Sequence, residues 1–164
     1  MTSGGQGGAI VSRNKSLIDK IRDYRQFDCR DDANIRFNFQ MTDLQAAIGR
    51  VQLSKLPNFI EKREKLFTIY RQSLLTLFEA NKPLTTSSYY RAILQCNNAD
   101  RVIASLKEYD VQAINPIEEF ELLDDPENYP IARNLTKTTV SLPIYPNLNE
   151  QAVRWIAQIV NDLI

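Results

Sequence analysis

The sequence predicts an α+β fold, an α/β two-layer unit of about three strands covered by helices and preceded by a long helical connector. Apolar residues recur at helical spacing over several stretches, and short runs between them are rich in β-branched and aromatic residues. With 43% hydrophobic residues, the 164-residue chain is long enough to bury one ordinary core.

The first part of the chain is predicted to alternate loops with regular structure. Four of the five glycines fall within residues 1–8, which we expect to form a loop. Their spacing matches neither a P-loop nor a Rossmann fingerprint, so a flexible or structural turn is favoured over a phosphate cradle. Residues 9–12 are β-branched enough for a strand, residues 15–25 predict an amphipathic helix, and residues 26–35 are polar enough for an exposed loop.

An aromatic run after Arg36 leads into a helix start. In an extended chain, Arg36, Asn38 and Gln40 point to one face, and the two phenylalanines between them point to the other. Thr42 and Gln45 have the spacing of a capping box. Polar groups just before a helix N-terminus are well positioned to meet an anion, so Asn38 is either a turn former or a ligand contact.

In the rest of the chain, changes in the spacing of the apolar residues predict the helices and strands. From residue 42 the pattern is helical, and Pro57 predicts a break or kink near Leu56 before a second helix over 57–80. Further along, we expect strands at 88–94, 110–114 and 138–142 and helices at 100–109 and 149–163. A short helix should close near 134–135, and residues 115–130 should be mostly loop or short helix.

Composition argues against several functions. Twenty basic residues balance twenty acidic ones, so the net charge gives no reason to expect nucleic acid as a partner. No apolar run is long enough to span a membrane, and no membrane partner is expected. The chain has no histidine, which excludes Ser-His-Asp and Cys-His nucleophile pairs and the usual zinc ligand sets.

Metal binding and disulfides are not expected either. The carboxylates between residues 118 and 125 lack the spacing of a calcium loop and favour a solvated loop, so no metal ligands are predicted. Cys29 and Cys96 are isolated from one another. They favour reduced thiols in a cytoplasmic protein over a disulfide.

Three motifs follow one another over nearly the whole chain: Thr-Ser-Gly-Gly-Gln-Gly-Gly at 2–8, Phe-Asn-Phe-Gln-Met-Thr-Asp-Leu-Gln-Ala-Ala-Ile-Gly at 37–49, and Ser-Leu-Pro-Ile-Tyr-Pro-Asn-Leu at 141–148. They resemble Thr-Thr-Gly-Glu-Gly-Gly, Tyr-Asn-Phe-Arg-Met-Ser-Asp-Leu-Gln-Ala-Ala-x-Gly and Ser-Leu-Pro-Leu-x-Pro-x-Leu of the DegT/StrS-type sugar aminotransferases. Those enzymes use pyridoxal phosphate (PLP) to make amino sugars on nucleotide carriers. The chain is similar to their carboxy-terminal part.

The resemblance implies the small C-terminal domain of a fold-type I PLP-dependent transferase. Residues 1–40 would be a remnant of the large PLP-binding domain, residues 41–80 connecting helices, and residues 81–164 the small α+β domain. The family lysine that forms the Schiff base with PLP would precede Met1 by one residue. Lys15, Lys20 and Lys55 do not match its place, so we expect no catalytic residue and no transaminase activity from this chain alone.

Four residues are implied as binding residues. Asn38 matches a family asparagine that reaches across a dimer interface toward the cofactor phosphate of the neighbouring subunit. Thr2 and Ser3 match the loop beside the lysine, which makes them cofactor-binding candidates. Gln40 stands where the family usually has an arginine and is the candidate for substrate binding.

Two hypotheses remain open. In the first, the chain is a split half, a truncated copy or a misassigned start of a nucleotide-sugar aminotransferase, and it works with a partner chain that bears the lysine and the large domain. In the second, it is a non-catalytic interaction or dimerisation module derived from that family. In both cases Phe37, Phe39 and Leu44 would lack cover in the isolated chain, so we expect homodimers or higher oligomers.

Overall fold

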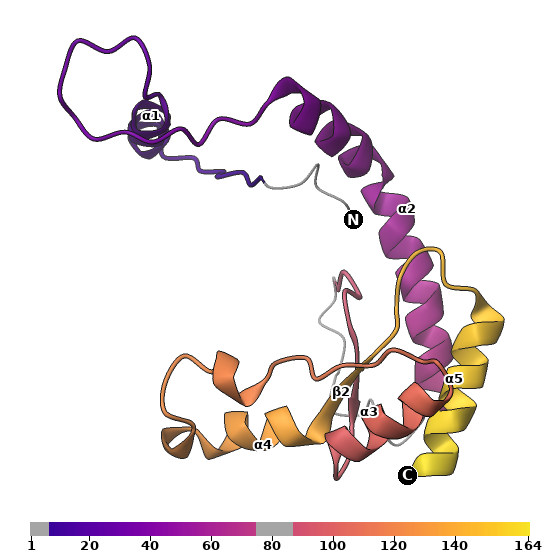
Figure 1. The fold of residues 1–164 in the computed structure, drawn as a ribbon. Helices are drawn as coiled ribbons and strands as arrows, with labels where there is room; N and C mark the ends of the chain where they lie inside the picture. The colour runs from indigo at the N-terminus through magenta and orange to yellow at the C-terminus, as the bar shows by residue number, and fades with distance from the viewer. Residues whose placement is uncertain (1–6, 75–86) are drawn as a thin grey trace. The chain divides into compact units, whose positions relative to one another are not determined.

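The computed structural model describes residues 7–74 and 87–164 and divides the chain into two compact units, Met1–Leu56 and Pro57–Ile164 (Figure 1). The predictions for residues 1–6, which include Thr2 and Ser3, and for residues 75–80 of the expected helix lie outside the described residues. The three-part division at residues 40 and 80 stays a prediction. No helix in the described ranges is long and apolar enough to cross a bilayer.

The first unit contains one complete helix, α1 (Lys15–Arg25), at the predicted residues. Ile18 and Ile21 on its apolar face are half-buried. The strand predicted at 9–12 is wrong, because these residues form no regular structure and Val11 is exposed. A strand needs a neighbour to satisfy its backbone N–H and C=O groups, and no described segment pairs with this one.

Helix α2 (Asp43–Ser73) is continuous, so of the break or kink predicted near Leu56 the break is wrong. Pro57 removes one backbone hydrogen bond from the helix, but intact turns continue on both sides. Beyond Pro57 the helix is held by tertiary packing, since Leu66 and Tyr70 are buried in the core of the second unit. The boundary between the two compact units falls at this proline, within the helix.

The second unit is built on a two-stranded antiparallel sheet, β1 (Ala92–Gln95) and β2 (Thr139–Leu142), with Leu94 opposite Val140. The strand predicted at 138–142 is confirmed, whereas the one predicted at 88–94 starts only at Ala92 because Tyr89 has a left-handed φ of 47°. Of the third predicted strand, 110–114, only a bridge from Ile114 to Ser141 forms. The α+β class is confirmed with a smaller sheet.

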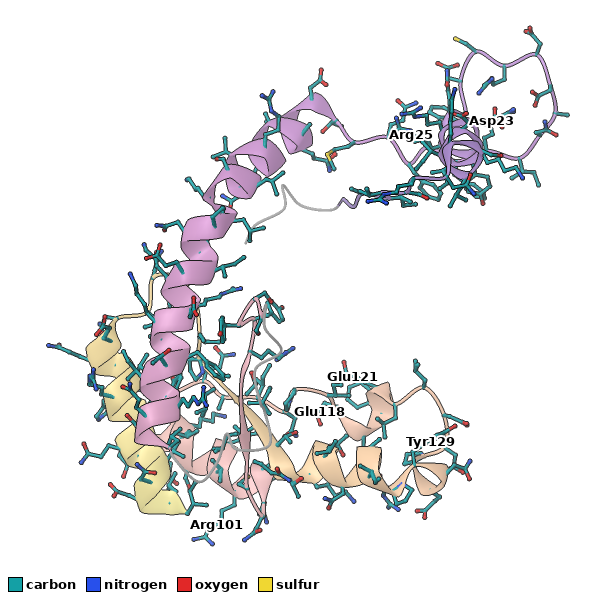
Figure 2. The ribbon with its side chains drawn as sticks, turned by 180° about the vertical axis from the view of Figure 1, so that it is seen from behind. Asp23, Arg25, Arg101, Glu118, Glu121 and Tyr129 are labelled. Atoms are coloured by element: carbon teal, nitrogen blue, oxygen red, sulfur yellow. The ribbon has the colours of Figure 1, made fainter. Side chains whose placement is uncertain are left out.

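Helices α3 (Ala99–Glu108), α4 (Pro130–Thr138) and α5 (Glu150–Leu163) surround this sheet. The predicted helices at 100–109 and 149–163 are confirmed. The short helix α4 runs on to Thr138 instead of closing at 134–135, and 115–130 contains only two 3₁₀ turns, η1 (Glu119–Glu121) and η2 (Pro126–Asn128). Helix α5 lies beside the second half of α2 (Figures 1 and 2), where the Asn161 side chain donates to the Ser73 carbonyl (N···O 2.9 Å).

Apolar residues of these elements form one core. Its fully buried side chains include Tyr70 and Leu74 from the α2 end, Leu94 and Val140 from the sheet, and Val153 from α5. Trp155 of α5 is half-exposed and meets Tyr109 edge-on, with ring centroids 6.4 Å apart.

Asparagine side chains cap the starts of three of the described helices. The Oδ1 atoms of Asn14, Asn98 and Asn149 accept hydrogen bonds from the backbone N–H three residues later, with N···O distances of 3.1, 3.0 and 2.7 Å. Each cap satisfies one N–H that has no partner inside its helix.

Candidate functional site

The candidate site is the segment from Arg36 to Gln40, between α1 and α2. Arg36 lies over the C-terminal turn of α1, where its Nε donates to the Asp23 carbonyl (3.1 Å) and Nη2 donates to the Asp23 carboxylate (3.1 and 3.2 Å). On its other side, Nη1 and Nη2 grip the two Asp32 oxygens at 2.5 and 3.0 Å. Arg36 therefore ties the second half of the 26–35 loop to the end of α1, and its side chain is only 6% exposed.

This arrangement, which we call the Arg36 clasp (Arg36 with Asp23 and Asp32), changes the role expected for Arg36. The sequence predicted that its guanidinium shares a polar face with Asn38 and Gln40. Instead it is turned back onto two carboxylates and holds the loop. Its hydrogen bonds to Asp32 and then Asp23 raise the pKa of Arg36, so the charge is permanent but already paired.

The clasp also positions an aromatic cluster, defined as Tyr24, Phe37 and Phe39. The Phe37 N–H donates to the Tyr24 carbonyl (3.1 Å), and the two phenylalanine rings stack with centroids 5.3 Å apart. Tyr24 lies against Phe37 at 5.1 Å. As predicted, the two phenylalanines lie together on one side of the segment.

Asn38 is the middle residue of a tight three-residue turn, because the Phe39 N–H donates to the Phe37 carbonyl (3.0 Å). The side-chain amides of Asn38 and Gln40 are exposed and have no hydrogen-bond partner among the described residues. They are the free polar groups of this segment. The other two cofactor-binding candidates, Thr2 and Ser3, lie outside the described residues.

The start of α2 is closed by its own side chains. The Thr42 N–H donates to Gln45 Oε1 (3.0 Å) and the Gln45 N–H donates to Thr42 Oγ1 (3.3 Å), so the predicted capping box is confirmed. Asp43 adds a negative charge to the first turn. The capping box and the charge of Asp43 therefore reduce the attraction of this helix end for an anion. The donors that could bind an anion here are the side-chain amides of Asn38 and Gln40, which precede the helix.

Other polar clusters have structural explanations. Glu118 and Glu121 close a capping box around η1 (Figure 2), and Glu119 pairs with Arg133 at 2.9 Å. In residues 7–74 and 87–164, no set of three or more metal-ligating side chains is placed to hold an ion. Cys29 is exposed and Cys96 is buried, and both thiols are free.

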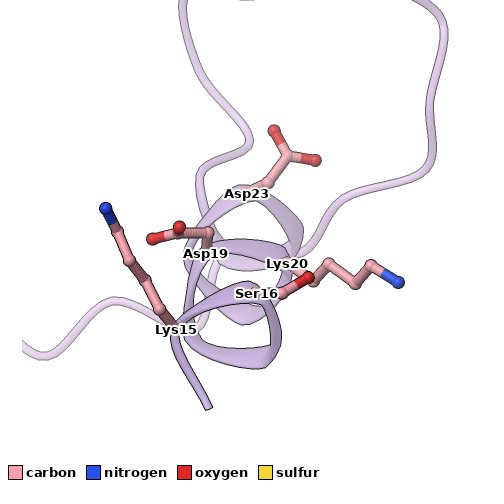
Figure 3. A pocket seen from close by; sticks show the side chains of 5 residues that line it. All are labelled: Lys15, Ser16, Asp19, Lys20 and Asp23. Carbon is pink, nitrogen blue, oxygen red and sulfur yellow. The ribbon is translucent and has the colours of Figure 1, made fainter.

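An open hollow on α1 is lined by Lys15, Ser16, Asp19, Lys20 and Asp23 (Figure 3). All five side chains come from one helix, and the two lysines extend away from each other. Their charges are matched by the two aspartates, so the hollow presents no convergent set of groups to a ligand.

Acid should open the Arg36 clasp. The hydrogen bond from Arg36, and then that from the Asn34 N–H, lowers the pKa of Asp32 from 3.8 to about 2. A depressed pKa means that the clasp is complete above about pH 4 and is lost as the pH falls through about 2. We expect the NMR signals of the Arg36 Nη–H groups, which donate to Asp32, to lose their dispersion in that window, and Asp32→Asn to show the open state at pH 7.

Asp31→Asn is the matched control, because Asp31 is exposed and has no partner within the described ranges. It should leave the signal unchanged at pH 7. An Arg36 signal that is the same at pH 2 and pH 7 would contradict the clasp.

The clasp was the feature that sequence reasoning missed. Its only local signal is the spacing of Asp32 and Arg36, four residues apart, which is a common ion-pair spacing on helices but here lies in a loop. The pairing with Asp23, thirteen residues away, has no sequence signature.

Nearly the whole chain is similar to known proteins of one family. The model of the DegT/DnrJ/EryC1/StrS aminotransferase family matches residues 1–161. GDP-perosamine synthase of Escherichia coli O157:H7 is 24% identical over 96% of this chain and 47% of its own length. The erythromycin biosynthesis sensory transduction protein EryC1 of Saccharopolyspora erythraea is 29% identical over 90% of this chain and 44% of its own.

Solved structures share the fold. The aminotransferase TlmJ of Streptoalloteichus hindustanus superposes with a TM-score of 0.78 at 22% identity, covering 92% of this chain and 45% of that one. The chain thus spans about half the length of the relatives it matches.

Proposed function

Because the chain belongs to the DegT/DnrJ/EryC1/StrS aminotransferase family, we propose that it is the carboxy-terminal part of a PLP-dependent nucleotide-sugar aminotransferase of amino-sugar biosynthesis. The family match over residues 1–161 supports the fold and the reaction class. The observation that supports a site in this chain is the free, exposed amide of Asn38, held in a tight turn between the clasped Arg36 and the capped start of α2.

The described residues can supply one contact to the cofactor, but they do not form a complete cofactor pocket. Asn38 Nδ2 is a free donor suited to a phosphate oxygen, and the turn and the clasp fix its backbone. PLP, when bound, supplies an electron sink to the bonds around the reacting carbon. In this proposal Asn38 orients the cofactor phosphate of a neighbouring subunit, and Gln40, two residues on, contacts the nucleotide sugar.

The amine that exchanges with the substrate is proposed to come from a polypeptide that carries the large domain. The resemblance assigns no lysine of this chain to that role. Lys65, for example, donates a hydrogen bond to Glu61 (2.8 Å), which raises the pKa of Lys65 and keeps it protonated. The partner proposed to supply the amine therefore carries the large domain, whereas a second copy of this chain would be a dimer partner without that amine. The free thiols suit a cytoplasmic setting.

A non-catalytic interaction module is the second candidate. It is favoured by the exposed apolar side chains of the first unit, among them Phe39 (65% exposed) and Leu44 (72% exposed). The in-frame DNA upstream of Met1 separates the two. A lysine codon directly before Met1 within a long open frame supports the aminotransferase, whereas an intergenic region with a ribosome-binding site supports the module.

Asn38→Ala is expected to weaken PLP binding of the assembled enzyme by about tenfold or more, because a hydrogen bond to a charged group is lost. Gln40→Ala should instead raise KM for the nucleotide sugar and leave PLP affinity unchanged. Titration of PLP followed by absorbance measures the first effect, and steady-state kinetics measures the second.

Asn34→Ala is the control, since Asn34 also presents an exposed side-chain amide near the clasp. It should leave both quantities unchanged. If Asn38→Ala binds PLP as tightly as the parent, the cofactor role of Asn38 is wrong. If the isolated chain forms a PLP adduct that borohydride makes permanent, the proposed need for a partner is wrong.

A further inference from the structure

Two aromatic side chains of the second unit meet at its surface. Tyr109 ends α3 and Trp155 lies on α5, and their ring centroids are 6.4 Å apart with an angle of 80° between the ring planes. Tyr109 is 50% exposed and Trp155 is 47% exposed, so each ring leaves part of its surface to solvent. Two rings at nearly a right angle form an open corner, which we call the Tyr109–Trp155 corner.

The end of α3 fixes one side of this corner. The Asp110 N–H donates to the Lys107 carbonyl, with an N···O distance of 3.0 Å. The Val111 N–H donates to the Leu106 carbonyl at the same distance of 3.0 Å, and the two bonds together form a Schellman motif that closes the helix. Leu106 and Val111 are also buried in the core, so the backbone of Tyr109 is held between two anchored residues.

Asp110 occupies the position of this motif that glycine usually takes. Its φ is 56°, in the left-handed region that most side chains disfavour. Backbone strain kept at a single residue is a reason to look for a role of its side chain. Asp110 is exposed, and its carboxylate has no ion-pair partner among the described residues. A free negative charge therefore lies one residue from the Tyr109 ring.

An aromatic corner with an adjacent carboxylate has the chemistry of a site for an organic cation. The face of an aromatic ring attracts a cation, and several rings around one quaternary ammonium group form the aromatic cages that recognise such ligands. Within residues 7–74 and 87–164, no lysine or arginine stacks on either ring, so the corner is open to a cation from outside. A lysine ammonium is strongly hydrated, whereas a quaternary ammonium group has no N–H to donate to water. Rings that are half-exposed therefore favour the quaternary group.

We propose that Tyr109, Trp155 and Asp110 form a surface site for a quaternary ammonium group. The two rings contact the methyl groups of the ligand, and the carboxylate of Asp110 supplies the opposite charge. The site lies where the end of α3 meets α5 (Figure 1). It shares no residue with the Asn38 segment and does not depend on the proposed function.

The test is a titration of the chain, without PLP, with choline chloride, followed through the fluorescence of Trp155, the only tryptophan. We expect a saturable change at concentrations on the order of millimolar, since exposed cation–π contacts are individually weak. Sodium chloride at the same ionic strength should give no saturable change. Dimethylbutanol, the uncharged alcohol in which carbon replaces the nitrogen of choline, should bind more weakly than choline.

Three variants locate the site. Tyr109→Ala should weaken choline binding by about threefold or more, because one cation–π contact is lost, whereas Tyr109→Phe keeps the ring and should stay within about twofold of the parent. Asp110→Asn should also weaken binding by about threefold, and asparagine tolerates the left-handed backbone of this position. Tyr129→Ala is the matched control, because it removes a similarly exposed tyrosine (53%) of the same unit (Figure 2) and should leave the affinity unchanged.

The outcomes separate the parts of the proposal. Absence of a saturable change with choline overturns the site, and equally tight binding of the uncharged alcohol overturns the assignment to a cation. A loss in Tyr129→Ala equal to that in Tyr109→Ala overturns the location. Trimethyllysine presents the same group on an amino acid, so the tighter of choline and trimethyllysine identifies the carrier. Melting curves followed by circular dichroism verify that each variant is folded.

Discussion

Replacing Tyr70 by alanine is expected to lower the free energy of unfolding of the Pro57–Ile164 unit by about 3–5 kcal/mol. Tyr70 is fully buried in the core, and its hydroxyl donates to the Pro143 carbonyl (2.9 Å), 73 residues away. The substitution removes the ring that holds the end of α2 to the core and leaves the carbonyl of the half-buried Pro143 without its donor. Urea unfolding followed through Trp155, the only tryptophan of the chain, measures the effect.

Tyr70→Phe separates the hydroxyl from the ring. It keeps the packing and should cost only about 1 kcal/mol, the usual net value of one hydrogen bond. Burial raises the pKa of Tyr70 above its ordinary value of 10.0, so its neutral form is favoured in the folded state. The stability it contributes is complete below about pH 10 and falls as the pH rises further. Tyr70→Phe should flatten that alkaline loss, and equal alkaline curves for both proteins would contradict the assignment.

Leu94→Ala is expected to destabilise the same unit by about 2–5 kcal/mol. Leu94 is fully buried in β1 opposite Val140, in a core to which helices α2, α3 and α5 also contribute. The same Trp155-detected urea titration reports this loss. Because cavity costs depend on how far the surroundings can collapse, a value near the upper end indicates a rigid core.

Leu123→Ala is the matched control for the leucine prediction. Leu123 lies in the 115–130 loop of the same unit and is fully exposed, so its truncation should change the free energy of unfolding by less than about 0.5 kcal/mol. If both leucine variants are equally stable, the core described for this unit is wrong.

The helices were predictable because their signals are local. The apolar spacing of α1, α3 and α5 and the Thr42–Gln45 box each lie within a few residues, and all are found where expected. Pro57 misled for a physical reason: a single lost hydrogen bond is outweighed by tertiary contacts that a local pattern does not contain. The strands predicted at 9–12 and 110–114 failed for a similar reason, since strand pairing, as between Ile114 and Ser141, joins residues that are far apart in sequence.

In the candidate site, too, local features could be predicted and contacts between distant residues could not. That Asn38 lies at a turn just before a capped helix was predictable from neighbouring residues. That Arg36 faces away from it could not be predicted, because Asp23 comes from the preceding helix. Because the clasp pairs Arg36 with two carboxylates, the exposed side chains of Asn38 and Gln40 are the polar groups of this segment that can still bind a ligand.

The asparagine caps have a consequence for the chemical ageing of the protein. Slow hydrolysis of an asparagine amide to a carboxylate damages many proteins, but at Asn14, Asn98 and Asn149 the oxygen that accepts the backbone N–H would be retained. The new negative charge would also lie at the positive end of each helix dipole. At these three positions, conversion to aspartate leaves the helix start supported, so samples stored for long periods should keep these helices.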